Sequence, residues 1–203
     1  VQVSPVTEFH SGAGYQYEDS VIYGFTHTNK GHWNLCHIPL LPVTGTPTPG
    51  DYCSPFSHER ESAAPGYYQV FLDRYGVDAQ LSSTLRCAFH KYTYPAGAAA
   101  SLLADLQRSN EHVRAWDIRK EGDNVFAGWQ QTGEKMYFYA VANRPVTGIE
   151  PVVEGDREVR IVRFGEGDGA LELRIGFSFV SEKNARENLE AEMLGKSFAE
   201  VRS

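Results

Sequence analysis

The chain has 203 residues, 41% of them hydrophobic and 22% charged, and its formal net charge is −7. This size and composition indicate a folded domain with a large buried core and argue against intrinsic disorder. The negative charge and the absence of a run rich in Lys and Arg argue against nucleic-acid binding. No run of about eighteen apolar residues is present, so we expect no membrane span.

The first residues, VQVSPVT, alternate like a strand that has already begun, without an initiator Met or a signal peptide. We therefore expect a trimmed N-terminus. Farther along, the loop VTGTPTPGDYCSP, residues 43–55, is rich in Pro and Gly and predicts a surface loop. Residues 67–95 alternate with period two on both sides of Arg74–Val77, which predicts strands joined by a turn.

The period-two pattern continues through the second half of the chain. Residues 113–131 predict two strands around a Gly-Asp-Asn turn, and residues 135–145 predict a further strand. The stretch EVRIVRFGEGDGALELRIGFSFV predicts one long hairpin around Gly165–Gly169.

The pattern changes to a helical period after residue 180. Ala185, Leu189 and Met193 are four residues apart and form one apolar stripe. Ser181 is suited to the N-cap, and Gly195 to the position just beyond the C-terminus of the helix.

Strands therefore fill residues 1–180, and residues 181–203 form a helical exit. The sequence predicts an all-β fold, a large antiparallel β-sandwich followed by a C-terminal helix. The apolar stripe of that helix either packs on the sandwich or leads into another domain.

Three His, one Trp and one Cys lie together in HTNKGHWNLCHIP, residues 27–39. His27, His32 and His37 are five residues apart, a spacing that puts strand side chains on opposite faces and matches no zinc motif. Cys36 and His37 are adjacent, so their side chains point apart on an extended chain, and we expect Cys36 to be a small buried hydrophobic residue. Both observations argue against a self-contained catalytic centre.

The chain has three cysteines, Cys36, Cys53 and Cys87. None belongs to a C-x-x-C motif, and an odd number allows at most one internal disulfide, so the redox state stays open.

Carboxylates offer no clear catalytic pair. Glu59 and Glu61 share a face if the chain is extended there, whereas Glu18 and Asp19 do not, and we expect each of them to be solvated. The acidic turn Glu166–Asp168 lacks the ligand pattern of a calcium loop.

A sugar site is the remaining interpretation of the cluster. His32, Trp33 and Asn34 combine an imidazole, a flat indole and an amide after Gly31, and such a set suits the apolar faces and hydroxyl groups of saccharides. The alternative is that Trp33 anchors the loop in the core. The residue types alone leave both interpretations open.

Several long stretches resemble glycoside hydrolase family 92, the exo-acting α-mannosidases. They include VQVSPVT, GYQYEDSVIYGFTHT, the run from SPFSHERESAAPGYY to FHKYTYP, and GFSFVSEKNARENLEAEM. They occur in the family's order and together cover essentially the whole chain.

The resemblance implies a two-domain enzyme, in which a β-sandwich (supersandwich) leads through helices to an (α/α)6 catalytic domain that this chain lacks. It implies that calcium, bound mainly by that absent domain, holds the terminal mannose, and that hydrolysis inverts the anomeric centre. The catalytic acid and base would be carboxylates of the absent domain, about 6.5–9.5 Å apart. With the barrel absent, we expect the stripe Ala185, Leu189 and Met193 and the loops at the domain junction to be unusually exposed or packed in a crystal.

The resemblance also implies that the loops Phe9–Tyr15 and His27–Cys36 form one wall of a sugar pocket at the domain junction. No catalytic and no metal-binding residue is expected in this chain. The implied substrate-binding residues are Phe9, His10, Tyr15, Asn29, Lys30, His32, Trp33 and Asn34.

The chain departs from the commoner family pattern in this wall. Many members read HTHLSGTGCSDYGD where this chain has the shorter HTNKGHWNLCHIP, and many carry Trp near the position of Phe9. The linkage that is cleaved therefore stays open between α-1,2, α-1,3, α-1,4 and mannose on a phosphate. Lys30 and His32 favour an anionic leaving group.

Three functions remain to be weighed. The first is the non-catalytic half of an exo-α-mannosidase, inactive alone, whose partners are a mannose-terminated glycan and the (α/α)6 domain of the same protein. The second is a stand-alone carbohydrate-binding sandwich, and the third is a structural or interaction domain. The family resemblance implies a periplasmic or secreted protein.

Overall fold

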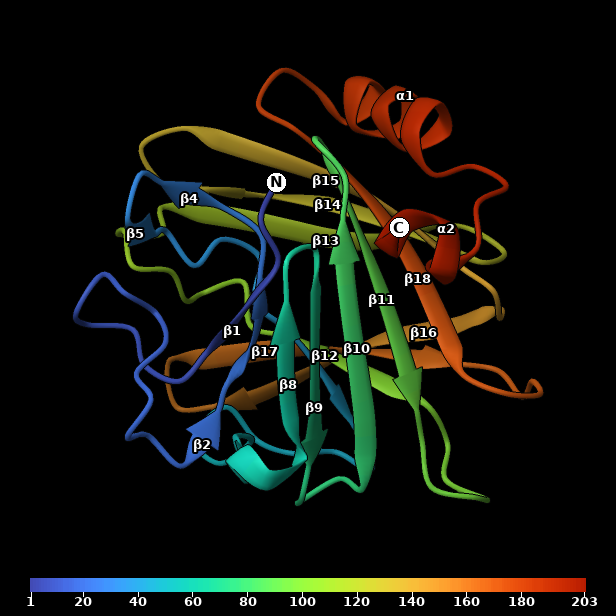
Figure 1. The fold of residues 1–203 in the computed structure, drawn as a ribbon. Helices are drawn as coiled ribbons and strands as arrows, with labels where there is room; N and C mark the ends of the chain where they lie inside the picture. Colours follow the sequence, from blue (N-terminus) through green and yellow to red (C-terminus); the bar gives the residue numbers. More distant parts are fainter.

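Two antiparallel sheets face each other across one hydrophobic core in the computed structural model, which describes residues 1–203 (Figure 1). The smaller sheet contains, in spatial order, β1 (Ser4–Val6), β3 (Gly24–Thr26), β6 (Leu40–Val43), β12 (Ser101–Ala104), β17 (Arg157–Phe164) and β16 (Val146–Glu154). The larger contains β13 (Ala115–Gly122), β14 (Val125–Gln131), β15 (Lys135–Ala142), β18 (Leu171–Ser178), β11 (Cys87–Thr93), β10 (Val77–Ser83), β9 (Tyr67–Leu72) and β8 (Glu61–Ala64). The predicted all-β sandwich is confirmed.

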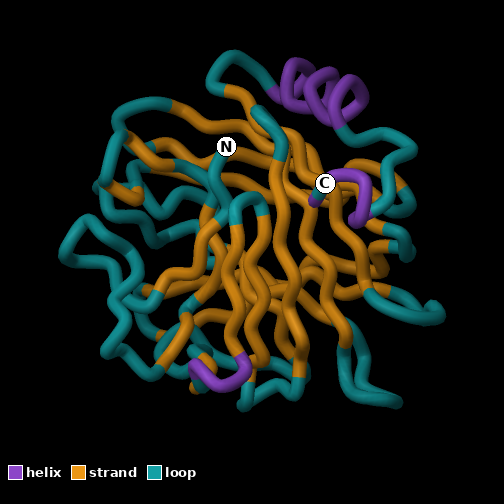
Figure 2. Tube along the Cα trace, viewed as in Figure 1, coloured by secondary structure: helices purple, strands orange, loops and turns teal.

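Several short elements lie outside the two sheets (Figure 2). Two small ribbons pair β2 (Val21–Ile22) with β7 (Ser54–Pro55), and β4 (Asn29–Lys30) with β5 (Trp33–Asn34). A 3₁₀ helix, η1 (His58–Arg60), precedes β8, and the chain ends with α1 (Glu182–Glu192) and α2 (Phe198–Arg202). Neither α-helix has the length and apolar character needed to cross a membrane.

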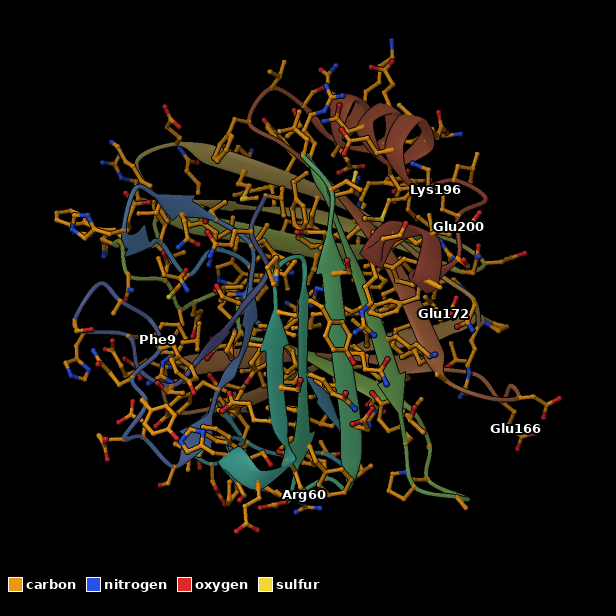
Figure 3. All side chains as sticks on the ribbon, in the orientation of Figure 1. Phe9, Arg60, Glu166, Glu172, Lys196 and Glu200 are labelled. Carbon is orange, nitrogen blue, oxygen red and sulfur yellow. The ribbon has the colours of Figure 1, made fainter.

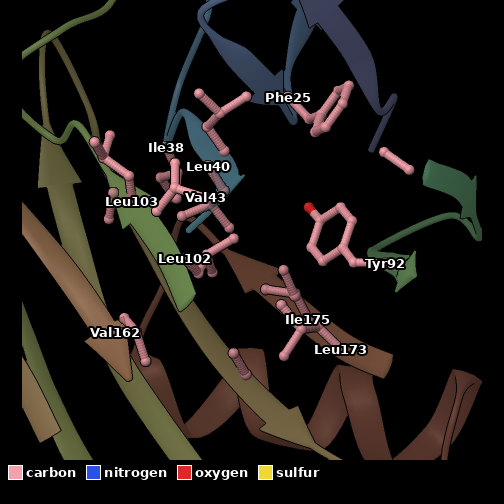
Figure 4. Close-up of a cluster of buried hydrophobic side chains, with 14 of the residues drawn as sticks. Phe25, Ile38, Leu40, Val43, Tyr92, Leu102, Leu103, Val162, Leu173 and Ile175 are labelled. Atoms are coloured by element: carbon pink, nitrogen blue, oxygen red, sulfur yellow. The ribbon is translucent and has the colours of Figure 1, made fainter. Parts of the chain in front are cut away.

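The alternating sequence pattern produces the core. Along β15, Met136, Phe138 and Ala140 point inward and are buried, while the residues between them are partly exposed. One cluster of 37 buried residues draws side chains from both sheets, so a single core holds the sandwich together. Figure 4 shows its centre, where Phe25 and Leu102 of the smaller sheet face Tyr92 and Ile175 of the larger.

The predicted hairpin around Gly165–Gly169 is wrong. Strand β17 pairs with β12 and β16 in the smaller sheet, whereas β18 pairs with β15 and β11 in the larger. Residues 165–170 therefore cross the gap between the facing sheets, about 10 Å in a typical sandwich. A period-two pattern shows that both strands bury one face but does not show which strands they pair with.

Helix α1 begins where the sequence predicts. The Ser181 side chain accepts a hydrogen bond from the Asn184 amide at 3.1 Å, which confirms the N-cap. Beyond the helix, Gly195 has a φ of +78°, the left-handed conformation that Gly adopts without steric cost. The second helix, α2, was not predicted; Ser197 and Glu200 form its capping box.

The expectation that the helical stripe would be exposed is wrong. Ala185, Leu189 and Met193 are at most 1% exposed, because α1 packs on the outer face of β18 and β15 (Figure 1). A second, smaller core forms there from Cys87, Phe89, Leu189, Met193 and Phe198. The outer face of the large sheet thus supplies the apolar surface that the stripe requires.

Gly176 of β18 permits this close approach of helix and sheet. A Cβ atom at residue 176 would lie 2.1 Å from the Ala185 carbonyl oxygen and 2.8 Å from Leu189 Cβ. Gly148 of β16, by contrast, has nothing within 4 Å of such an atom.

We predict that Gly176→Ala lowers the free energy of unfolding by about 1–3 kcal/mol, because α1 must shift away from the sheet. Urea unfolding followed by circular dichroism measures the loss. The matched substitution Gly148→Ala should change the stability by less than about 0.5 kcal/mol. Equal stability of the two variants would contradict the close helix–sheet contact.

Candidate functional site

The ribbon β4–β5 displays three of the predicted residues on a projecting turn. Lys30 pairs with Trp33, and Gly31 takes a φ of +61° at the first position of the two-residue turn between them. Trp33 is 57% exposed, so the interpretation that it anchors the loop in the core is wrong. His32 is also exposed and stacks edge-to-face on the indole at 5.7 Å between ring centres.

The second predicted loop, Phe9–Tyr15, is organised by a single carboxylate. Glu8 is 6% exposed and accepts hydrogen bonds from the amides of His10 (2.6 Å), Ser11 (2.9 Å) and Gly14 (3.2 Å), and from the Ser11 hydroxyl. Burial acts to raise the pKa of Glu8, but the hydrogen bonds from Ser11 and His10 outweigh it and lower the pKa to about 2. The loop is therefore built around an ionised carboxylate.

Asn34 joins the two loops into one surface. Its backbone N–H donates to the Gly12 carbonyl at 2.8 Å, which ties β5 to the Phe9–Tyr15 loop. Its side chain is 2% exposed and turned inward, where Oδ1 accepts from the Thr26 hydroxyl (3.2 Å) and the Cys36 amide (2.9 Å), and Nδ2 donates to the Ser4 hydroxyl (3.1 Å). All of these contacts lie within the domain.

Phe9 and Tyr15 are held by residues from distant parts of the chain. The Phe9 ring lies 4.8 Å from the Arg108 guanidinium and packs edge-to-face on Tyr23 at 5.8 Å. The Tyr15 hydroxyl donates to both oxygens of Glu61 at 3.1 Å. His10 is exposed, with Nδ1 2.9 Å from the Glu8 carboxylate.

The predicted residues do not converge on one cavity. Asn29 lines a hollow of about 670 Å³ together with Thr28, Phe177 and Asn188, whereas Phe9 and His10 line a separate hollow of about 580 Å³. The others line neither of these two hollows. Figure 3 shows Phe9 on the edge formed by the first loops and Glu166 on the opposite edge, so the acidic turn at residue 166 takes no part in this surface.

The three histidines of the cluster point to different partners. His27 is fully buried, with its Nε2 3.1 Å from His90 Nε2. His37 Nε2 lies 2.9 Å from the Glu111 carboxylate, and its Nδ1 lies 2.8 Å from the Thr28 hydroxyl. His32 is exposed. Burial lowers the pKa of His27 to about 3, so this imidazole is neutral at pH 7.

Cys36 is fully buried, as predicted. Burial, reinforced by the nearby Glu8 charge, raises the pKa of its thiol to about 12, so no thiolate is available as a nucleophile. All three cysteines are unpaired.

Glu61 corrects the expectation that each of these carboxylates would be solvated. Its side chain is only 10% exposed and accepts from Tyr15, from the Tyr68 hydroxyl (2.5 Å) and from His58 Nδ1 (2.5 Å). The chain turns through η1 just before residue 61, which points Glu61 inward and leaves Glu59 exposed. No local pattern marks this role, because the donors lie as far as 46 residues away.

The sequence does not indicate a role for Arg108 either, because its partners are also distant in the chain. Its guanidinium lies beside both the Phe9 and the Tyr23 rings, 5.0 Å from the centre of the latter, and lines the same hollow as Phe9. An arginine in a polar stretch carries no signal of such stacking until the fold brings the rings together.

A two-sheet sandwich with one joined loop surface is the class of domain that this geometry defines. The model of the glycosyl hydrolase family 92 N-terminal domain matches residues 1–186. The chain belongs to this family and corresponds to its N-terminal domain. No curated protein matches it.

Solved structures give the same assignment. The GH92 alpha-mannosidase BT3965 from Bacteroides thetaiotaomicron, also solved with mannoimidazole, has a TM-score of 0.89 and 25% identity over 99% of this chain and 33% of its own. The GH92 glycosyl hydrolase ccman5 has a TM-score of 0.84 and 26% identity over 98% of this chain and 32% of its own. The inverting mannosidase BT2199 from Bacteroides thetaiotaomicron VPI-5482 has a TM-score of 0.83 over 98% of this chain and 30% of its own; at 21% identity it shows the fold alone. The chain thus spans about a third of the structures that it matches.

We predict that stability depends on the ionisation of Glu8. Because its pKa is lowered, the stabilisation is fully present above the ordinary pKa of 4.5 and is lost as the pH falls towards 2. The loss is on the order of 3 kcal/mol, and Glu8→Gln should show it already at pH 7. Urea unfolding at several pH values measures both effects.

The exposed carboxylate of Glu166 provides the control, since Glu166→Gln should leave the stability at neutral pH unchanged. A wild-type advantage over Glu8→Gln that is as large at about pH 2 as at pH 7 would contradict the role of the charge.

Proposed function

We propose that this chain is the non-catalytic half of a calcium-dependent, inverting exo-α-mannosidase that releases terminal mannose from glycans. In this proposal it forms one wall of the sugar pocket and hydrolyses nothing by itself. The observation that carries it is the tie between the amide of Asn34 and the carbonyl of Gly12, which joins the two predicted loops. Membership of family 92 supports the reaction class.

The chemistry of the joined surface suits a saccharide. The exposed indole of Trp33 presents a flat apolar face to sugar C–H groups, with the donors of Lys30 and His32 beside it. Phe9 and His10 line a separate hollow together with Arg108, and the hydrogen bond from Asn34 to Gly12 ties their loop to the ribbon. The side chain of Asn34 shapes this wall from within rather than touching the sugar.

We propose that calcium is bound by the rest of the protein, as the family resemblance implies. The residues of this chain do not fit such a site, because Glu8 and Glu61 already accept several hydrogen bonds each, and no three His, Cys, Asp or Glu side chains gather to hold an ion. We place the catalytic acid and base on the (α/α)6 domain as well. We also propose a periplasmic or secreted location, as the family resemblance implies.

The direct test compares the whole protein with this chain on mannobioses. We expect the whole protein to release mannose with inversion, seen by NMR as the β-anomer forming first, and a chelator to abolish the release until calcium is added back. This chain alone should release none. Release of the α-anomer, or full activity in chelator, would overturn the proposal.

Two substitutions in the exposed ribbon separate its roles. We predict that Trp33→Ala weakens mannobiose binding by the whole protein about tenfold, with the stability unchanged within about 0.5 kcal/mol.

Lys30→Ala should impair cleavage of a mannosyl phosphate more than that of mannobiose, because only the phosphate pairs with the ammonium. Equal effects of Lys30→Ala on both substrates would remove the anionic leaving group from the proposal.

The alternative is a stand-alone carbohydrate-binding sandwich, which the exposed Trp33 also suits. Calorimetry with mannosides on this chain alone decides between the two. Strong binding without the other domain favours the module, and its absence favours a shared pocket.

A further inference from the structure

His58 lies between the first loop and the edge of the large sheet. Its Nδ1 is 2.5 Å from the Glu61 carboxylate, and its Nε2 is 2.8 Å from the backbone carbonyl of Tyr17. The exposed Tyr17 ring stacks on the imidazole at 4.0 Å with an angle of 3° between the planes, and Phe56 meets it edge-on at 5.2 Å.

Both polar partners of His58 only accept hydrogen bonds. A neutral imidazole has one N–H group, so it can donate to either the carboxylate or the carbonyl but not to both. The imidazolium has two N–H groups and satisfies both contacts at once. With an ionised Glu61, the observed geometry therefore favours a protonated His58.

We propose that protonated His58 and Glu61 form a clamp that positions the segment Phe9–Ser20, and that the clamp opens when His58 loses its proton. The Glu61 carboxylate also contacts this segment directly, because it accepts a hydrogen bond from the Tyr15 hydroxyl. The link to substrate binding rests on the proposed function, because this segment carries Phe9, His10 and Tyr15. His58 and Glu61 act here as positioning residues.

The charges around His58 favour the protonated form. Glu61 faces it from β8 and Glu18 from the first loop, whereas its neighbour Arg60 is paired with Asp73. The hydrogen bond to Glu61, and then that to the Tyr17 carbonyl, raise the pKa of His58.

Among the phenolic side chains of this cluster, Tyr17 stacks on the His58 imidazole, whereas Tyr15 and Tyr68 face Glu61. The Tyr15 and Tyr68 hydroxyls both donate to that carboxylate. Because the pKa of His58 is raised in the folded chain, its contribution is full below the ordinary value of 6.5 and is lost as the pH rises through the raised value. The clamp is therefore closed below pH 6.5 and opens as the pH rises through the raised pKa of His58.

The test follows the ring nitrogens of His58 by ¹⁵N NMR during a pH titration of the folded chain, with the urea-unfolded chain as the reference. We expect two protonated ring nitrogens below pH 6.5 and a higher titration midpoint than in the unfolded chain. The amides of Asp19 and Phe56, which donate to the carbonyls of Gln16 and Ser20, report on the segment. Their protection from hydrogen exchange, corrected for the intrinsic rate, should fall about tenfold through the same midpoint.

Glu61→Gln should lower the midpoint of His58 and reduce the amide protection already below pH 6.5, where the wild-type clamp is closed. The exposed Glu59 is the matched control, because Glu59→Gln changes the same charge two residues away and should alter neither readout. The wild-type titration requires no substitution, so it decides the question even if Glu61→Gln does not fold.

A His58 ring with one proton while the segment remains protected would overturn the clamp, as would amide protection that does not change through the titration. Both readouts are independent of sugar binding. If the clamp titrates in this chain but the whole protein releases no mannose, only the proposed function is rejected.

Discussion

Contact between the inner faces of the two sheets is the interaction on which every other feature depends. Side chains such as Phe25 and Ile175 are fully buried there, and this burial fixes where the strand ends lie. The strands β3 and β6 belong to that contact, and the cluster of residues 27–39 connects them. The candidate surface is thus carried by the rim of a rigid scaffold, as binding loops commonly are.

Irregular loops at this rim need partners for their polar groups, because no ladder of strand hydrogen bonds serves them. Three side chains provide these partners, and each forms several hydrogen bonds: Glu8, Asn34 and Glu61. Each is largely buried, so its hydrogen bonds form where water competes little. The exposed side chains of Trp33 and His32 can therefore be presented on a loop whose backbone is fixed from below.

In the proposed enzyme, this sandwich and the catalytic domain have different roles. The domain supplies shape and contacts, and its carboxylates serve to hold loops, as Glu8 and Glu61 show. A sandwich of this kind specifies no reaction by itself, because chemistry depends on the groups placed at a site. The ionisation of His58 adds a link between pH and loop position that uses the same structural carboxylate.

The sequence by itself determined the sandwich, the helix at Ser181 and the family, because these depend on local period, capping and long matched stretches. It did not determine the strand partners of β17 and β18, the burial of Leu189, or the inward turn of Glu61. Only the tertiary structure decided these, since pairing, helix docking and hydrogen bonding join residues far apart in the chain. The same reason separates two neighbours in sequence: Asn34 is buried by contacts with Ser4 and Thr26, whereas Trp33 is left exposed.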